Sequence, residues 1–216
     1  TARRLLAALQ GMAVAFRSGN PAEFATHAAE FEQSVLQSSG AALPERNAME
    51  TELRYPDLDA FGRAWVAYLV GVVFLFLFHR RRSRWTAVAG QGLIAVGCLF
   101  HSTGIALRWA ISGRAPVSDM YESLVFMSWG IVALGLVLGF RHGGRVFASS
   151  AAAAGSIVLM IAETLPLDSA INPLLPVLAH TAWLSVHVMT VMLSYSAFAL
   201  AMALGHVALG IHLLRP

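Results

Sequence analysis

The chain has 216 residues, of which 57% are hydrophobic and only 12% are charged. Soluble domains usually carry about a quarter charged residues. The composition therefore excludes an ordinary cytoplasmic enzyme and a disordered or collagen-like chain, and it indicates a polytopic membrane protein. The net charge of +3 is too small to indicate a nucleic-acid partner. The single cysteine, Cys98, excludes an internal disulfide framework and a CxxC metal or haem-attachment motif.

Residues 1–60 differ from the rest of the chain because eight of the twelve acidic residues lie there. Leu5–Phe16 has a mixed helical pattern that ends at Gly19. The run Asn20-Pro21-Ala22-Glu23 then has the pattern of a helix start, with an N-cap, a proline at the first helical position and an acidic residue at the third. We expect residues 1–58 to form an extracytoplasmic helical hairpin. From the pattern alone, we interpret this segment as a solvated linker domain.

From Phe61 onward, long apolar stretches alternate with short charged segments. About 20 apolar residues span a hydrocarbon core about 30 Å thick, so each stretch is long enough to cross a membrane. The sequence therefore predicts an all-α polytopic membrane bundle in residues 59–216. Its five expected transmembrane helices are residues 61–78, 86–107, 123–140, 146–165 and 181–214.

The arginines predict the orientation of these spans, because cytoplasmic loops carry an excess of basic residues. The gap at residues 79–85 contains four arginines, and the gap at 141–145 contains two. These alternate gaps must share one side of the membrane, which we assign to the cytoplasm. The N-terminal segment and the loops 111–122 and 166–180 then face outward and are extracytoplasmic.

His187 is a candidate ligand in the last span, one helical turn past Trp183. A neutral imidazole there can bind haem iron as an axial ligand, and the neighbours Trp183, Val186 and Val191 can shield a porphyrin. The spacing is also compatible with a hydrogen-bonded interface histidine. His101, in the second span, is either another ligand or an interhelical hydrogen-bonding group.

The outward loop after the second span is rich in charge. Arg108 and Arg114 lie on the outward side, against the usual distribution of arginine, and guanidinium groups bind carboxylates such as haem propionates. Ser118 is placed to cap the following helix, while Asp119 and Glu122 favour its N-terminus through the helix dipole. The loop is therefore interpreted either as a ligand-binding segment or as a structural cap.

Two runs of residues are long enough to carry a family resemblance. The first extends from Arg108-Trp109 through Gly113-Arg114-Ala115-Pro116-Val117-Ser118-Asp119-Met120-Tyr121-Glu122-Ser123 to Ser128-Trp129. The second contains Pro173–Leu178, then Trp183-Leu184 and His187-Val188, and then Ser194-Tyr195. Together with Glu52-Leu53-Arg54-Tyr55 they resemble the CcsA (ResC) family, the haem-handling proteins of system II cytochrome c biogenesis.

The resemblance implies an outward-facing site that binds haem, b-type and non-covalent while in transit, and presents it for covalent attachment to apocytochrome c. It implies that His187 is one of two outward axial ligands. It also implies an assembly factor, and not an enzyme, in the lipid bilayer of the bacterial inner (plasma) membrane, beside a ResB- or CcsB-type subunit that is separate or fused. The cofactor-binding residues expected on this basis are His187, Trp183, Arg108, Arg114, Tyr121 and Glu122.

The resemblance also bears on the extent of the chain. Family members carry a tryptophan-rich haem segment and the second ligand further along, so we expect this chain to be a piece of a longer polypeptide.

One alternative function is a membrane transporter of haem or another amphiphile, with His101 as an intermediate binding site. Another is a structural membrane subunit whose histidines serve packing.

Overall fold

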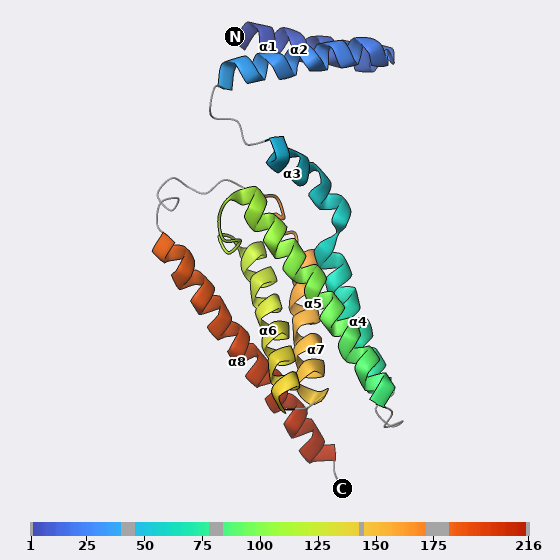
Figure 1. Ribbon diagram of the computed structural model, residues 1–216, viewed down its shortest axis with the longest axis vertical. Coiled ribbons are helices and arrows are strands. Elements are labelled where there is room, and N and C mark those ends of the chain that lie inside the picture. Colours follow the sequence, from blue (N-terminus) through green and yellow to red (C-terminus); the bar gives the residue numbers. More distant parts are fainter. Residues whose placement is uncertain (1, 40–45, 78–83, 143–144, 172–181, 215–216) are drawn as a thin grey trace. The chain divides into compact units, whose positions relative to one another are not determined.

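The secondary structure of the described residues is entirely helical (Figure 1). The computed structural model describes residues 2–39, 46–77, 84–142, 145–171 and 182–214. No strand occurs within these ranges, so the all-α class is confirmed. The chain divides into two compact units, Thr1–Met49 and Glu50–Pro216. The division into an extracytoplasmic segment at 1–58 and a membrane domain at 59–216 stays a prediction.

The first unit is a hairpin of two helices, α1 (Ala2–Ser18) and α2 (Pro21–Ser39), which pack against each other. Gly19 makes the turn between them with a φ of 66°, in the left-handed region that glycine adopts at little cost. The Asn20 side-chain oxygen accepts hydrogen bonds from the backbone N–H groups of Ala22 at 3.2 Å and Glu23 at 3.3 Å. The predicted helix start at Asn20-Pro21 is therefore confirmed.

The second unit contains most of α3 (Arg46–Leu58) and five further helices. These are α4 (Ala60–Leu77), α5 (Arg84–Ser112), α6 (Met120–His142), α7 (Arg145–Thr164) and α8 (Ala182–Leu214). Five helices in the described ranges are long and apolar enough to cross a membrane, which agrees with the expected number of spans. Much of the arginine-rich gap at 79–85 and of the loop at 166–180 lies outside the described residues.

Two of these helices extend beyond the spans expected from hydropathy. The second span was expected to end at residue 107, but α5 continues to Ser112. The third was expected to begin at residue 123, but α6 begins at Met120. The difference has one physical reason: the charged residues that end the apolar runs, Arg108 and Glu122, pair with each other and so lie within folded helix ends.

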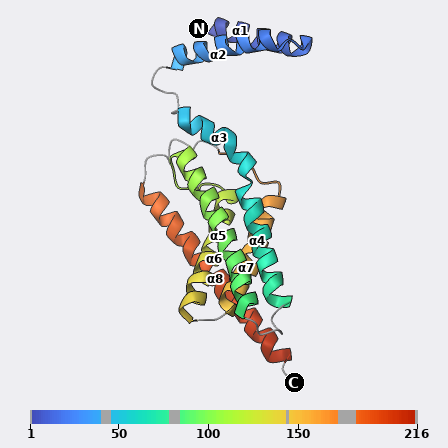
Figure 2. The same ribbon diagram turned by 45° about the vertical axis from the view of Figure 1, so that its right-hand side comes forward.

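Close backbone contacts hold α6 between α7 and α8, at positions where α6 carries glycine. A Cβ atom at Gly135 would overlap the Cβ of Ala151 on α7, and one at Gly130 would overlap the Ser196 hydroxyl on α8. Small residues of this kind let membrane helices approach closely. On the other side of the unit, α4 packs against both α5 and α7, and Figure 2 shows α4 and α5 running alongside each other.

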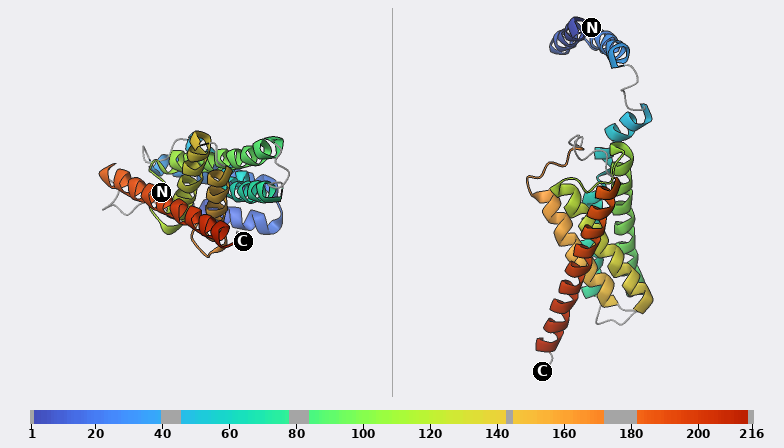
Figure 3. Two further views of the ribbon diagram at one scale, coloured as in Figure 1. Left: turned by 90° about the horizontal axis from the view of Figure 1, so that it is seen from below. Right: turned by 90° about the vertical axis from the view of Figure 1, so that its left-hand side faces the viewer.

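The last helix, α8, is the least covered of the five. In its most apolar window only 6% of the residues are buried, against 28–44% in the other four spans. It contacts α6 and α7, where Leu200 is buried and the Ser196 hydroxyl donates a hydrogen bond to the Met127 carbonyl at 3.0 Å. The two views of Figure 3 place α8 at the edge of this unit. Most of its length, including His187, is thus accessible beside the bundle.

Candidate functional site

Glu122 is the centre of a buried charge cluster where α5 ends and α6 begins. Its Oε1 atom accepts a hydrogen bond from Arg108 Nη2 at 3.2 Å, and its Oε2 atom accepts one from Arg114 Nη1 at 2.8 Å. The backbone N–H of Ser118 donates a third, at 2.9 Å to Oε2. The Glu122 and Arg108 side chains are 0% and 2% exposed, while that of Arg114 is 13% exposed. We call Arg108, Arg114, Ser118 and Glu122 the Glu122 cluster.

The chain between Gly113 and Met120 is shaped so that both arginines reach the same carboxylate. Gly113 ends α5 with a φ of 65°, and its N–H donates to the Trp109 carbonyl at 2.9 Å. Asp119 caps α6, because its Oδ1 atom accepts a hydrogen bond from the Glu122 N–H at 2.7 Å. The expectation that Ser118 caps this helix is wrong, since its hydroxyl contacts the Arg114 guanidinium instead.

Arg108 connects this cluster to two other segments of the chain, at Ser169 and at Tyr55, and also contacts Tyr121 beside Glu122. Its Nη1 atom donates a hydrogen bond to the Ser169 carbonyl at 2.9 Å. Its guanidinium lies 5.2 Å from the ring centroid of Tyr121 and 5.9 Å from that of Tyr55, within the range of cation–π attraction. Its Nε atom is buried and has no hydrogen-bond partner among the described residues. The charge of this buried arginine is therefore paired, but its Nε–H has no acceptor among the described residues.

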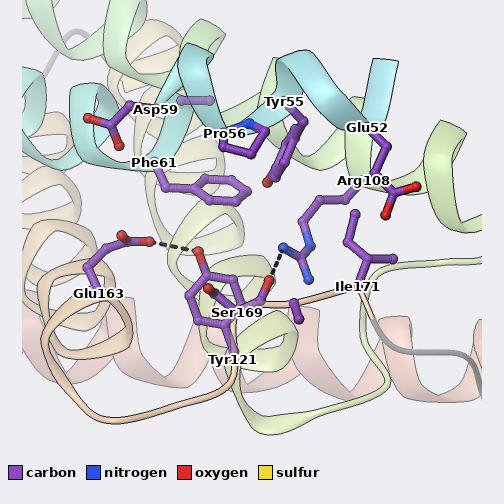
Figure 4. A pocket seen from close by; sticks show the side chains of 12 residues that line it. Glu52, Tyr55, Pro56, Asp59, Phe61, Arg108, Tyr121, Glu163, Ser169 and Ile171 are labelled. Carbon is purple, nitrogen blue, oxygen red and sulfur yellow. Dashed lines mark hydrogen bonds between the residues drawn. The ribbon is translucent and has the colours of Figure 1, made fainter. Parts of the chain in front are cut away.

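A pocket of about 490 Å³ lies beside Arg108, at the ends of α4–α7 and under α3. Tyr121 reaches across it, where its hydroxyl donates a hydrogen bond to Glu163 Oε1 at 2.7 Å. Figure 4 shows this bond and Tyr55 beside Arg108. The residues that line the cavity include Glu52, Tyr55, Asp59, Phe61, Arg108, Tyr121 and Glu163.

His187 and Trp183 lie apart from the Glu122 cluster, near the start of α8. They are four residues apart and so share one side of the helix. Both side chains are exposed, Trp183 at 75%. Within the described ranges neither forms a hydrogen bond or ion pair with any residue of the Glu122 cluster. The structure thus brings together Arg108, Arg114, Tyr121 and Glu122, and leaves His187 and Trp183 as a separate, accessible pair.

Comparisons with known proteins identify the kind of protein to which this arrangement belongs. No family model matches the chain. The chain is 33% identical over 180 residues to Protein NrfI of Wolinella succinogenes, covering 80% of this chain and 20% of that protein. It is 35% identical over 132 residues to the cytochrome c biogenesis protein CcsA of Synechocystis, covering 60% of this chain and 37% of the relative. Against CcsA of Prochlorococcus marinus it is 33% identical over 150 residues, covering 65% and 47%.

The chain belongs to the CcsA type. It spans less than half the length of these curated relatives. With five helices long and apolar enough to cross a membrane, this CcsA-type chain is a multi-pass membrane protein.

His101 of this CcsA-type chain is buried and has a partner at each ring nitrogen. Its Nε2 atom lies 3.0 Å from the Val125 carbonyl oxygen, and its Nδ1 atom lies 3.2 Å from the Tyr68 hydroxyl. Because a carbonyl only accepts, Nε2 carries the proton and Nδ1 accepts from Tyr68. Neither nitrogen is left for a ligand in this arrangement. The expectation of an interhelical hydrogen-bonding group is therefore confirmed, with bonds from α5 to α4 and α6.

Two groups of residues at the site were not singled out by sequence reasoning. Tyr55 and Glu163 reach Arg108 and Tyr121 from α3 and α7, and only the resemblance around Tyr55 gave any signal. The sequence shows the Ser128-Trp129 pair as part of a motif, but it does not show that the pair links helices. The Ser128 hydroxyl donates to the Gly155 carbonyl at 2.8 Å, and Trp129 Nε1 donates to the Ser102 hydroxyl at 2.9 Å. This pair therefore links α6 to α7 and to α5.

Proposed function

We propose that this CcsA-type chain takes part in cytochrome c biogenesis as an assembly factor that binds haem and presents it for attachment to apocytochrome c. The curated relatives named CcsA are described as cytochrome c biogenesis proteins. The observation that carries the proposal is the accessible His187 on α8, on the same side of the helix as Trp183. No residue of the chain needs to act as a nucleophile or base for this role, because the chain positions and shields its ligand.

The residues at the start of α8 fit an axial haem site. The His187 ring has no hydrogen-bond partner among the described residues, so a ring nitrogen is available to bind iron. Haem would supply this iron as a redox-active centre. Trp183 offers an exposed apolar surface one turn away, against which a porphyrin can lie. The haem would be of the b type, held without a covalent bond while in transit.

The Glu122 cluster has a different part in this proposal from the one that the sequence suggested. Glu122 already pairs with both guanidinium groups, so Arg108 and Arg114 are not free cations waiting for haem propionates. Arg114 is the more exposed of the two, and it is the one we assign to contact a propionate. Arg108, Tyr121 and Glu122 then act as positioning residues that hold the loop between α5 and α6.

The proposed setting follows from charge and from the relatives. We propose the bacterial inner membrane, with the arginine-rich gaps at 79–85 and 141–145 in the cytoplasm. The N-terminal segment, the loop between α5 and α6 and the loop at 166–180 then face outward, where apocytochrome c would meet haem. A ResB- or CcsB-type subunit, separate or fused, is the proposed membrane partner.

Cytochrome c maturation in cells tests this function. In a strain that depends on the full-length gene, His187→Ala is expected to reduce covalently bound haem in c-type cytochromes nearly to background, measured by haem staining of denaturing gels. The matched control is His206→Ala on the same helix. The exposed His206 ring is hydrogen-bonded to the Met202 carbonyl, and a strain that carries this variant should mature c-type cytochromes normally. Normal maturation in the His187→Ala strain, with the protein present at wild-type level, would contradict the proposal.

A further inference from the structure

The contact of α1 with α2 buries small residues of α1 and leaves its larger apolar residues exposed. Ala8 and Ala15 are 4% and 1% exposed where the two helices pack together (Figure 1). Leu6, Leu9 and Phe16 of the same helix are 58%, 46% and 79% exposed. Large apolar side chains are normally the first to be buried, and a group of them at the surface marks an interaction site. The hairpin therefore presents an apolar surface that its own packing does not use.

The exposed apolar residues share one side of the hairpin. Leu6, Leu9, Ala13 and Phe16 follow one another at i, i+3, i+7 and i+10, a spacing that places them along one side of α1. Phe24 of α2 extends this surface, because its ring centroid lies 6.4 Å from that of Phe16 and its side chain is 37% exposed. We call these five residues the apolar face of the hairpin. None of them lines the groove of about 370 Å³ between α1 and α2, whose walls are mainly polar.

The charges on α1 are all positive. The helix contains Arg3, Arg4 and Arg17 and no acidic residue, while the acidic residues of the hairpin all lie on α2. Arg3 precedes Leu6 by three residues and Arg17 follows it by eleven, so both exposed arginines lie beside the apolar face. Helices with an apolar side flanked by arginine lie in the interface of a bilayer and bind anionic headgroups. The charge on α1 is therefore complementary to a lipid surface.

The hairpin is also joined closely to a membrane span. Helix α2 ends at Ser39, and the first candidate span begins at Thr51. Because each residue adds at most about 3.6 Å, the chain between them reaches no further than about 40 Å. Such a tether keeps the effective concentration of bilayer around α1 high, so that a modest interfacial affinity is sufficient to hold it there. The bilayer has this advantage over any soluble partner that would have to diffuse to the apolar face.

We propose that the apolar face of the hairpin lies on the bilayer that holds the spans, in its headgroup region. Leu6, Leu9 and Phe16 enter the boundary between headgroups and acyl chains, and Arg3 and Arg17 donate hydrogen bonds to the phosphate groups of anionic lipids. This assigns lipid binding to a segment that the sequence pattern alone interprets as a solvated linker. It depends neither on haem binding by the chain nor on which side of the membrane is cytoplasmic.

Spin labelling of the full-length protein tests the proposal. A nitroxide is attached at Leu9→Cys, and in a second variant at Ala13→Cys, after the other cysteines are replaced by alanine. The protein is reconstituted into vesicles of phosphatidylcholine and phosphatidylglycerol. Oxygen concentrates in lipid and a nickel chelate in water, so the ratio of their collision rates reports where the label lies. This ratio is expected to be at least about fivefold higher at Leu9 than at the control Gln33→Cys, an exposed position in the polar groove of the hairpin.

The contradicting results distinguish lipid from water and from protein. Ratios at Leu9 and Ala13 equal to that at Gln33 would place the apolar face in water and overturn the proposal. Low collision rates with both oxygen and the nickel chelate would also overturn it, and would instead identify a protein surface that covers the apolar face.

The arginines are tested in the same assay. Arg3→Gln combined with Arg17→Gln is expected to lower the ratio at Leu9 by about twofold in vesicles with phosphatidylglycerol, and to change it little in phosphatidylcholine alone. An equal ratio with and without the two substitutions in both kinds of vesicle would overturn the assignment of these arginines to anionic headgroups.

Discussion

Replacing Glu122 by alanine is expected to destabilise the folded protein by about 3–5 kcal/mol. The substitution removes the acceptor of three hydrogen bonds and leaves the buried guanidinium of Arg108 without its counter-charge. Arg108 is 2% exposed and cannot regain that stabilisation from water without moving out of the site. Because the cluster fixes the loop between α5 and α6, the same change should also loosen the contact of Arg108 with the Ser169 carbonyl.

Unfolding of the full-length protein by sodium dodecyl sulfate, followed by circular dichroism, measures this effect. Arg114→Ala is expected to cost less than Glu122→Ala, because the Arg114 side chain is 13% exposed and Arg108 keeps its carboxylate. Gln10→Ala, at an exposed position in the middle of α1, is the control and should unfold as the parent does. An unfolding free energy for Glu122→Ala within about 0.5 kcal/mol of the parent, the usual range for surface changes, would contradict the buried cluster.

Gly135→Val is expected to destabilise the contact between α6 and α7 by about 1–3 kcal/mol, the usual cost of overpacking. A single Cβ at Gly135 would already overlap the Cβ of Ala151, so the two helices must separate to accept a branched side chain. Separation of α6 from α7 would also strain the hydrogen bond between the Ser128 hydroxyl and the Gly155 carbonyl.

The matched control is Gly92→Ala on α5, where no atom lies within 4 Å of the added Cβ. Alanine favours a helix over glycine by up to about 1 kcal/mol, so this variant should be as stable as the parent or slightly more stable. The same detergent unfolding compares the two variants. Equal stability of Gly135→Val and Gly92→Ala would contradict the close packing of α6 against α7.

The helices could be predicted from the sequence because length and hydropathy alone decide whether a segment spans a membrane. The limits of α5 and α6 could not, since hydropathy treats Arg108 and Glu122 as unpaired charges that end a span. In the same way, capping patterns place both Ser118 and Asp119 before α6. Only the fold shows that the Ser118 hydroxyl contacts Arg114 and leaves the capping to Asp119.

The candidate site was predictable as a list of residues and not as an arrangement. Arg108, Arg114, Tyr121 and Glu122 lie in one stretch of sequence and do come together. Their partners Tyr55, Glu163 and Ser169 come from distant segments, and nothing in local patterns connects them to Arg108. The pairing of both arginines with the single carboxylate of Glu122 depends on distances that spacing in the sequence cannot supply.

The haem absorbance of the purified full-length protein tests the central claim, that His187 is an axial ligand. The parent protein is expected to purify with haem, His187→Ala with much less, and added imidazole should restore part of the lost absorbance by taking the vacant position. His212→Ala, at an exposed position on the same helix, should retain the parent spectrum. A His187→Ala protein whose haem content and spectrum equal those of the parent would contradict the account.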